Sequence, residues 1–354
     1  MIGQYYYRNK NGAGGMRKVT PGFETFSKSF YRRGAISAGE FAPPALLYER
    51  SDDHYFVGRE EIVDAGEDYY TVRHGFLFPR ALFERNVFGA KLYRFFDLAD
   101  LDCSLEGFEK EEILSSPRKI RIREGAGDHL RPEDVFRRGR EHSRFIQLLI
   151  YGTTLALTDD FSLVFLLPKT KPTGFYDQAV LNVKSLFALI PWELREYLTF
   201  HTYVDNRDGL GQAKISVSPL AADRIPRGNK IFYFDFSRFQ AGPDLVIMQK
   251  IRGTVAGPLI YRIWASRDEK ALSSLFYIFH HNRDLMPKDG VDRVAVDALC
   301  FYFLLTDVGR KYRSYLADDI GHVTKVSARE LMLFLAGHIS NREFLDLREM
   351  LGLI

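Results

Sequence analysis

Residues 161–168 read Phe-Ser-Leu-Val-Phe-Leu-Leu-Pro, and this stretch decides how the middle of the chain is expected to fold. A continuous apolar run that a proline ends is typical of a buried strand. Helical patterns flank the run, over about 131–157 and 176–190, and strand-like segments follow at 198–203 and 230–236. Helix, strand, helix and strand in this order predict an α/β layer.

Upstream of this layer, the chain shows the short aromatic segments of a β-rich domain. Strands are expected at 5–7, 45–48, 54–57 and 69–78, with turn-prone residues between them, and a short helix is expected at 80–88. The glycine-rich stretch 9–15 is interpreted as a hairpin tip. It lacks the Gly-Lys-Ser/Thr sequence of a phosphate-binding loop.

The last hundred residues are expected to be helical, over 267–283, 291–305, 327–338 and 341–351. Three stretches have the form Ser-x-x-Glu ahead of an apolar pattern. In such a capping box the serine oxygen accepts a free N–H at the helix start, and the glutamate bonds back to the N-cap N–H. The three serines expected to cap helices are Ser266, Ser327 and Ser340, with Glu269, Glu330 and Glu343 as their partners.

Length and composition limit the class of protein. The chain has 354 residues, 46% apolar and 27% charged, which is ordinary for a globular protein. The patterns predict an α+β protein with a β-rich domain at 1–125, an α/β domain at 126–255 and a helical domain at 256–354. Two distant cysteines exclude a disulfide framework. No secretory signal is visible, and every apolar stretch is shorter than the roughly 18–20 residues of a membrane span. We therefore expect a cytoplasmic protein without a membrane partner.

The usual catalytic motifs are absent from the sequence. There is no His-Glu-x-x-His and no Gly-x-Ser-x-Gly, and adjacent His280 and His281 point about 100° apart on a helix, so they are interpreted as surface residues. Two His-x-Thr/Ser strings start at His322 and His338, but the second falls at a predicted helix end, outside the context of a phosphoesterase motif. We predict no catalytic residue, metal or cofactor and lean against an enzyme. A hydrolase site assembled from scattered residues stays an alternative.

Charge is distributed unevenly along the chain. Residues 1–34 carry seven basic side chains and one acidic one, interleaved with aromatic residues, and residues 118–144 carry nine basic and five acidic ones. Arginine and tyrosine are frequent in protein interfaces, whereas basic and aromatic side chains together also bind phosphates and stack on bases. The candidate partner-binding residues are Gln4, Arg8, Arg17, Lys18, Arg32, Arg33 and Arg195. The alternative nucleic-acid-binding residues are Arg118, Lys119, Arg121, Arg123, Arg137 and Arg138.

Two anchors in the sequence resemble a known family. The start, Gly3-Gln4-Tyr5-Tyr6-Tyr7 followed by Pro-Gly-Phe-Glu-Thr-Phe-Ser-Lys-Ser at 21–29, is similar to the opening of the bacterial GTPase-associated protein family. The second anchor, 189–203, resembles that family's Leu-Pro…Arg…Leu-Ser-Phe-Ser-Thr-Tyr signature. Thr199 and His201 stand where the family usually has serine.

The resemblance implies an adaptor that binds a GTPase or an effector protein encoded nearby, in a bacterial conflict or signalling system. It brings no catalytic residue with it. Gln4 and Arg195 are expected to lie at the surface and to face the partner, while the rest of both anchors is expected to build the fold.

Overall fold

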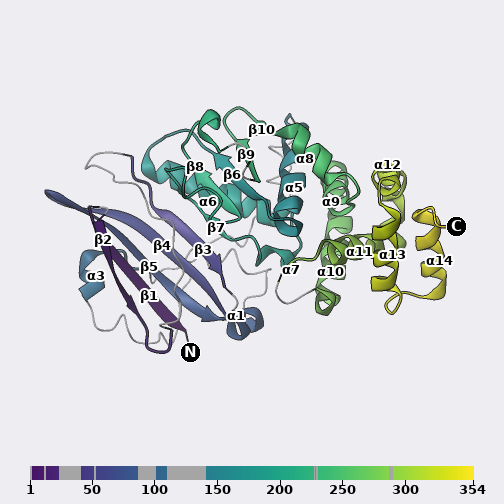
Figure 1. Ribbon diagram of the computed structural model, residues 1–354, viewed down its shortest axis with the longest axis horizontal. Coiled ribbons are helices and arrows are strands. Elements are labelled where there is room, and N and C mark those ends of the chain that lie inside the picture. The colour runs from purple at the N-terminus through teal and green to yellow at the C-terminus, as the bar shows by residue number, and fades with distance from the viewer. Residues whose placement is uncertain are drawn as a thin grey trace. The chain divides into compact units, whose positions relative to one another are not determined.

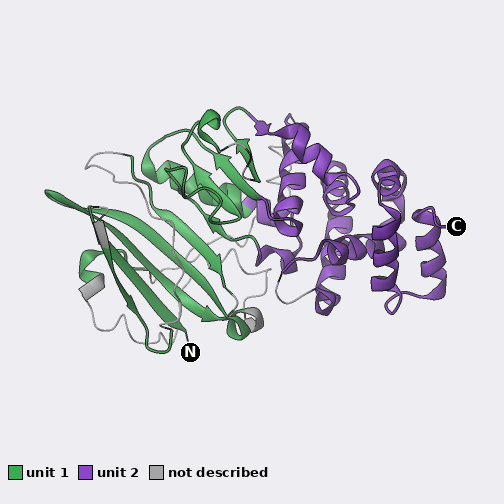
Figure 2. Cartoon of the chain, viewed as in Figure 1, with its two compact units in different colours: residues 1–129, 162–184, 198–238 green, residues 130–161, 185–197, 239–354 purple. Residues whose placement is uncertain are grey.

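The computed structural model describes residues 2–11, 13–23, 41–51, 53–86, 101–109, 141–226, 228, 230–286 and 290–354. It is an α+β protein, as expected, with one mixed sheet and many helices (Figure 1). The chain forms two compact units (Figure 2). The first contains residues 1–129, 162–184 and 198–238, and the second contains 130–161, 185–197 and 239–354. The chain passes between the units several times, so these boundaries differ from the three consecutive segments that the sequence patterns predicted.

Among the described residues, nine strands of the first unit lie side by side in the order β9-β6-β8-β7-β3-β4-β5-β1-β2. Strands β3, β4, β5, β1 and β2 pair antiparallel, and β7, β8, β6 and β9 pair parallel. The two halves meet where β3 pairs antiparallel with β7. The strands are β1 (Gly3–Lys10), β2 (Ala13–Val19), β3 (Ala45–Arg50), β4 (His54–Ala65), β5 (Asp68–Pro79), β6 (Ser162–Leu166), β7 (Phe200–His201), β8 (Ile215–Ser218) and β9 (Ile231–Asp235).

The expected strands are all present, with longer or shorter bounds. The segments expected at 54–57 and 69–78 extend into two twelve-residue strands, β4 and β5, that form a hairpin.

Facing glycines on β4 and β5 make room for an aromatic ring. Gly58 and Gly75 are paired in register, and a Cβ atom on Gly75 would lie 2.3 Å from the Phe56 ring. The glycines thus let this aromatic side chain lie flat on the sheet.

The glycine-rich stretch is mostly strand, so the expectation of a tip spanning 9–15 is too wide. Lys10 pairs with Ala13, and Asn11 has a positive φ of 47°, as a two-residue hairpin turn with Asn in its first position requires. Gly15 lies within β2, where a Cβ atom would come within 2.3 Å of the Tyr7 ring. Ring packing therefore explains this glycine, and no phosphate-binding role is needed.

The parallel half contains the apolar run at 161–168. Ser162–Leu166 forms β6, and its neighbour on one side is β9 and on the other β8. One face of these strands contributes to an apolar core made by Val164, Leu166, Val204, Leu210, Ile225 and Ile231. The remaining helical elements of this unit are α1 (Arg80–Asn86), α3 (Leu105–Glu109), η3 (Ala222–Arg224) and most of α6 (Pro172–Ala188).

The second unit is helical around a central helix. α11 (Arg293–Leu305) is almost wholly buried and packs against α9, α10, α13 and α14. The other elements are α5 (Ser143–Thr158), α7 (Trp192–Arg195), β10 (Gln240–Gly242), α8 (Asp244–Ile251), α9 (Ala256–Ser266), α10 (Glu269–His281), η4 (Arg283–Leu285), η5 (Arg310–Tyr312), η6 (Ser314–Leu316), α12 (Ala317–Gly321), α13 (Lys325–Leu335) and α14 (Asn341–Met350). The four expected C-terminal helices are confirmed as α10, α11, α13 and α14, whereas α8 and α9 were not expected.

Only one of the three expected capping boxes forms. Ser340 caps α14, and the side chain of Glu343 accepts from the Ser340 N–H at 2.8 Å. Ser266 instead ends α9, and Asp268 is the N-cap of α10. Ser327 lies inside α13, whose N-cap is Thr324. The pattern identified the right helices but the wrong cap at two of them.

Candidate functional site

Two ionised residues of the β4–β5 hairpin form a buried ion pair. Glu60 and Arg73 are paired in register, so their side chains leave the same face of the sheet. Arg73 donates from Nε to Glu60 Oε2 at 2.9 Å and also from Nη2, and the side chains are 2% and 1% exposed. Burial opposes the charge on Arg73, but the carboxylate of Glu60 outweighs it and holds the pKa of the guanidinium above its ordinary value.

A second buried pair lies at the junction of the antiparallel and parallel halves. His201 Nε2 on β7 is 3.0 Å from Glu49 Oε1 on β3, and their side chains are 2% and 10% exposed. Residues 49 and 201 are brought together because β3 and β7 are neighbours in the sheet. Glu49, Glu60, Arg73 and His201 are called the ionic belt below.

Two tyrosines of β1 border the ionic belt. Burial raises the pKa of Tyr5, and the nearby Arg73 charge partly opposes that rise. The Arg73 guanidinium also lies 5.7 Å from the centre of the Tyr7 ring, whose hydroxyl accepts from Asn9 Nδ2 at 3.0 Å. In the ionic belt each carboxylate faces a cation or an imidazole, away from water. This pairing holds the neighbouring strands in register, because removal of one residue would leave the charge of its partner buried and unpaired.

Gln4, a candidate partner-binding residue, is engaged inside the first unit. The Asp102 N–H donates to His74 Nδ1 at 2.8 Å, so the ring proton sits on Nε2 and is donated to Gln4 Oε1 at 3.0 Å. Gln4 is half-buried and its amide bonds to His74, so its expected position at the surface is only partly right.

Cys103 follows Asp102 in the chain and is buried. Burial raises the pKa of its thiol to about 12, which keeps the thiol protonated and unreactive.

Arg195 does not lie at the surface, and this expectation is wrong. The residue is 5% exposed. Its Nε donates to the Ile190 carbonyl at 2.8 Å, and its guanidinium lies 5.7 Å from the centre of the Phe276 ring on α10. Hydrogen bonding to a carbonyl and stacking on an aromatic ring satisfy a buried arginine, which therefore stabilises the second unit.

The remaining described candidates lie on the hairpin formed by β1 and β2. This basic hairpin, residues 3–19, contains Arg8, Lys10, Arg17 and Lys18 and no acidic residue. Register places Met16 opposite Arg8 and Lys18 opposite Tyr6, so Arg8 and Lys18 share one face, and Arg17, opposite Tyr7, takes the other. Arg32 and Arg33 lie outside the described residues, as do all six alternative nucleic-acid-binding residues.

In the second unit the buried acid Asp297 serves the backbone. Its Oδ1 on α11 accepts the Val255 and Ala256 N–H groups, each at 2.9 Å, at the start of α9. Burial is the largest influence on this carboxyl and raises its pKa to about 6, although the two N–H groups oppose the rise. Burial likewise raises the pKa of the Cys300 thiol on the same helix.

The histidine motifs acquire structural explanations. His280 and His281 end α10 at the surface, as expected, with His280 Nδ1 2.9 Å from Glu193 Oε1. The hydroxyl residues of the two His-x-Thr/Ser strings, Thr324 and Ser340, are both helix N-caps. No three acidic, histidine or cysteine side chains gather in metal-binding geometry within the described ranges.

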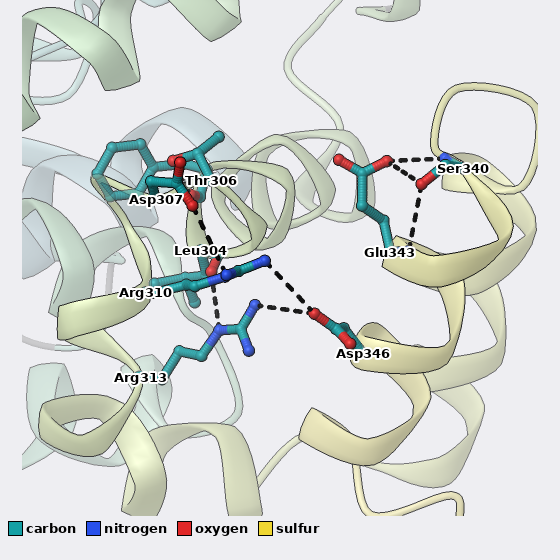
Figure 3. A network of polar contacts seen from close by, with 9 residues as sticks. Leu304, Thr306, Asp307, Arg310, Arg313, Ser340, Glu343 and Asp346 are labelled. Carbon is teal, nitrogen blue, oxygen red and sulfur yellow. Dashed lines mark hydrogen bonds and ion pairs between the residues drawn. The ribbon is translucent and has the colours of Figure 1, made fainter.

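A polar network fastens the last helix of the second unit (Figure 3). Arg310 and Arg313 each place a guanidinium nitrogen 3.9 Å from Asp346 on α14, and Arg313 also donates to the Leu304 carbonyl at 2.8 Å. The Ser340 cap lies on the same helix. These contacts hold α14 against the end of α11 and engage Asp346 within the unit.

Comparison with known proteins adds no assignment. No protein-family model matches the chain, and no curated protein is similar to it. None of the helices in the described part has the length and apolar content that crossing a bilayer requires.

Proposed function

We propose that this chain is a non-enzymatic adaptor that binds an acidic protein partner through its basic hairpin. The partner proposed is a GTPase or effector protein encoded nearby in a bacterial GTPase-linked conflict or signalling system. The sequence resemblance at 3–7, 21–29 and 189–203 supports the GTPase link. The basic residues of the hairpin support binding to an acidic surface of that partner.

The observation that carries the proposal is the charge of the hairpin and its place in the sheet. β2 is the last strand of the sheet among the described residues, and it carries Arg17, Lys18 and the 55% exposed Met16. Arg17 is also exposed. The hairpin carries four basic side chains and no acidic one, and Lys10 is paired with Asp68 at 2.7 Å. A surface of one sign steers a partner of the opposite sign and favours it over others.

Burial of three of the interleaved aromatics favours a protein partner over nucleic acid. Tyr5, Tyr6 and Phe23 are 4%, 0% and 5% exposed, so their rings are occupied in the core. Single-stranded nucleic acid binding depends on exposed rings that stack on bases.

The test is co-elution of the full chain with the GTPase encoded beside its gene, in the GDP and GTP states. Reversing the hairpin charge with Arg17→Glu and Lys18→Glu should weaken the complex by roughly tenfold or more and reduce its salt dependence. Lys250→Glu, an exposed lysine on α8, is the matched control and should leave binding unchanged.

Two results would count against the proposal. One is the absence of a complex in both nucleotide states, and the other is a complex that the hairpin variants leave intact. Micromolar binding of an oligonucleotide that falls steeply with salt in a fluorescence-anisotropy titration would favour the nucleic-acid alternative instead.

A further inference from the structure

Helix α13 has two large apolar side chains that the described residues of the second unit leave exposed. Ala328, Leu331 and Leu335 are buried, and the helix packs against α11. Val326 and Leu333 are 66% and 78% exposed. They are seven residues apart, which is two helical turns, so they lie on the same side of the helix.

Two charged residues lie between these apolar ones. Arg329 and Glu330 are exposed, and neither side chain forms an ion pair or hydrogen bond within the part of the chain that the structure describes. At about 100° per residue, the four side chains fall within an arc of about 100°. Val326, Arg329, Glu330 and Leu333 are called the α13 stripe below.

The α13 stripe is complementary to itself. In the order apolar, cation, anion, apolar, it is symmetric about the point between Arg329 and Glu330. A second α13 running antiparallel across that point places Val326 against Leu333 of the other copy and Arg329 against Glu330 of the other copy. A two-fold axis repeats each contact, as an isologous interface requires.

We propose that a second copy of this chain docks on the α13 stripe to form an antiparallel two-fold dimer. The match of opposite charges, flanked by the two exposed apolar side chains, argues for a copy of the chain as the occupant. α13 has eleven residues and is about 16 Å long, so the pair of helices alone makes a small interface. Interfaces at the low end of the size range are transient, and the dissociation constant is expected to be on the order of micromolar to tens of micromolar.

The first test is sedimentation velocity of the full chain over about 1 to 300 μM, a range that brackets the expected constant. The wild-type chain should shift from monomer to dimer, and Leu333→Glu should remove the shift. Leu245→Glu is the matched control because Leu245 on α8 is also 78% exposed. Its dimer should persist. Circular dichroism spectra check that both variants are folded.

The second test uses the symmetry itself. Arg329→Glu alone and Glu330→Arg alone each place like charges opposite one another twice, so each should raise the dissociation constant by roughly tenfold. The double variant Arg329→Glu with Glu330→Arg restores both pairs and should restore the dimer. A chain that stays monomeric throughout, a dimer that survives Leu333→Glu, or a double variant no tighter than the singles overturns the proposal. The tests need no other protein, so their outcome is independent of the adaptor proposal.

Discussion

Asp297 offers a sharp test of how the second unit is held together. Its carboxyl is buried and accepts two backbone N–H groups at the start of α9, from Val255 and Ala256. Asp297→Asn keeps an oxygen acceptor at the same place and removes the ionisable group. The substitution therefore separates the effect of the charge from the effect of the hydrogen bonds.

The size and sign of the expected change in stability follow from the raised pKa of Asp297. The carboxyl titrates near 6 in the folded unit and near 3.9 in an unfolded chain, a difference of about two units or ~3 kcal/mol. Because the folded pKa is the higher one, the folded state holds the proton more tightly. The protonated Asp297 carboxyl therefore contributes to the free energy of unfolding, and this contribution is present in full below about pH 4 and is lost as the pH rises through 6. Asp297→Asn should thus match wild type near pH 4 and be more stable by up to ~3 kcal/mol near pH 7.5.

Urea unfolding followed by tryptophan fluorescence measures this difference at each pH. Both tryptophans of the chain, Trp192 and Trp264, belong to the second unit, so the signal reports that unit. Asp292→Asn is the control, because Asp292 is an exposed cap of the same helix that accepts the Val294 N–H. If the difference between Asp297→Asn and wild type stays constant from pH 4 to 7.5, a buried, charge-penalised Asp297 is the wrong description.

Two further substitutions test the ionic belt and the helix caps. Glu60→Gln leaves Arg73 buried beside a neutral amide and should destabilise the first unit by about 3–5 kcal/mol, whereas replacing both residues with apolar ones should recover most of that loss in thermal unfolding. Ser340→Ala should lower the free energy of unfolding by about 1 kcal/mol and speed amide exchange in α14, whereas Ser327→Ala, inside α13, should change either quantity much less. Equal effects of the two serine substitutions would contradict the cap assignment.

The sequence predicted the elements well where apolar spacing is regular. The run at 161–168 follows from its continuous apolar composition and the proline that ends it, and the C-terminal helices follow from the helical spacing of their apolar residues. Caps were harder to assign. Ser327 fits the capping pattern, but Thr324 has the extended backbone of an N-cap, with φ −67° and ψ 156°, and begins the helix one turn earlier. Sequence spacing does not say which of two hydroxyl residues leaves the helical conformation.

Arg195 and the ionic belt were missed for a common reason. Polar side chains are mostly exposed, so these two arginines, two glutamates and one histidine were read as surface residues or were not singled out as buried partners. Their burial depends on partners far away in sequence. The Phe276 ring that faces Arg195 is 81 residues away, and His201 is 152 residues from Glu49. Such long-range pairs are set by which strands and helices pack together in the fold, and sequence spacing does not reveal that packing.

One pair of the ionic belt could nevertheless have been predicted from the sequence. Gly66 has a positive φ of 82°, and the two-residue turn at 66–67 pairs Ala65 with Asp68. In an antiparallel hairpin this fixes every later pair, because each step back along one strand is a step forward along the other. Counting from that turn places Glu60 opposite Arg73. Opposite charges directly across a hairpin attract, so recognition of the turn would have predicted this pair. No comparable turn joins β3 to β7, and Glu49 and His201 could be paired only from the folded structure.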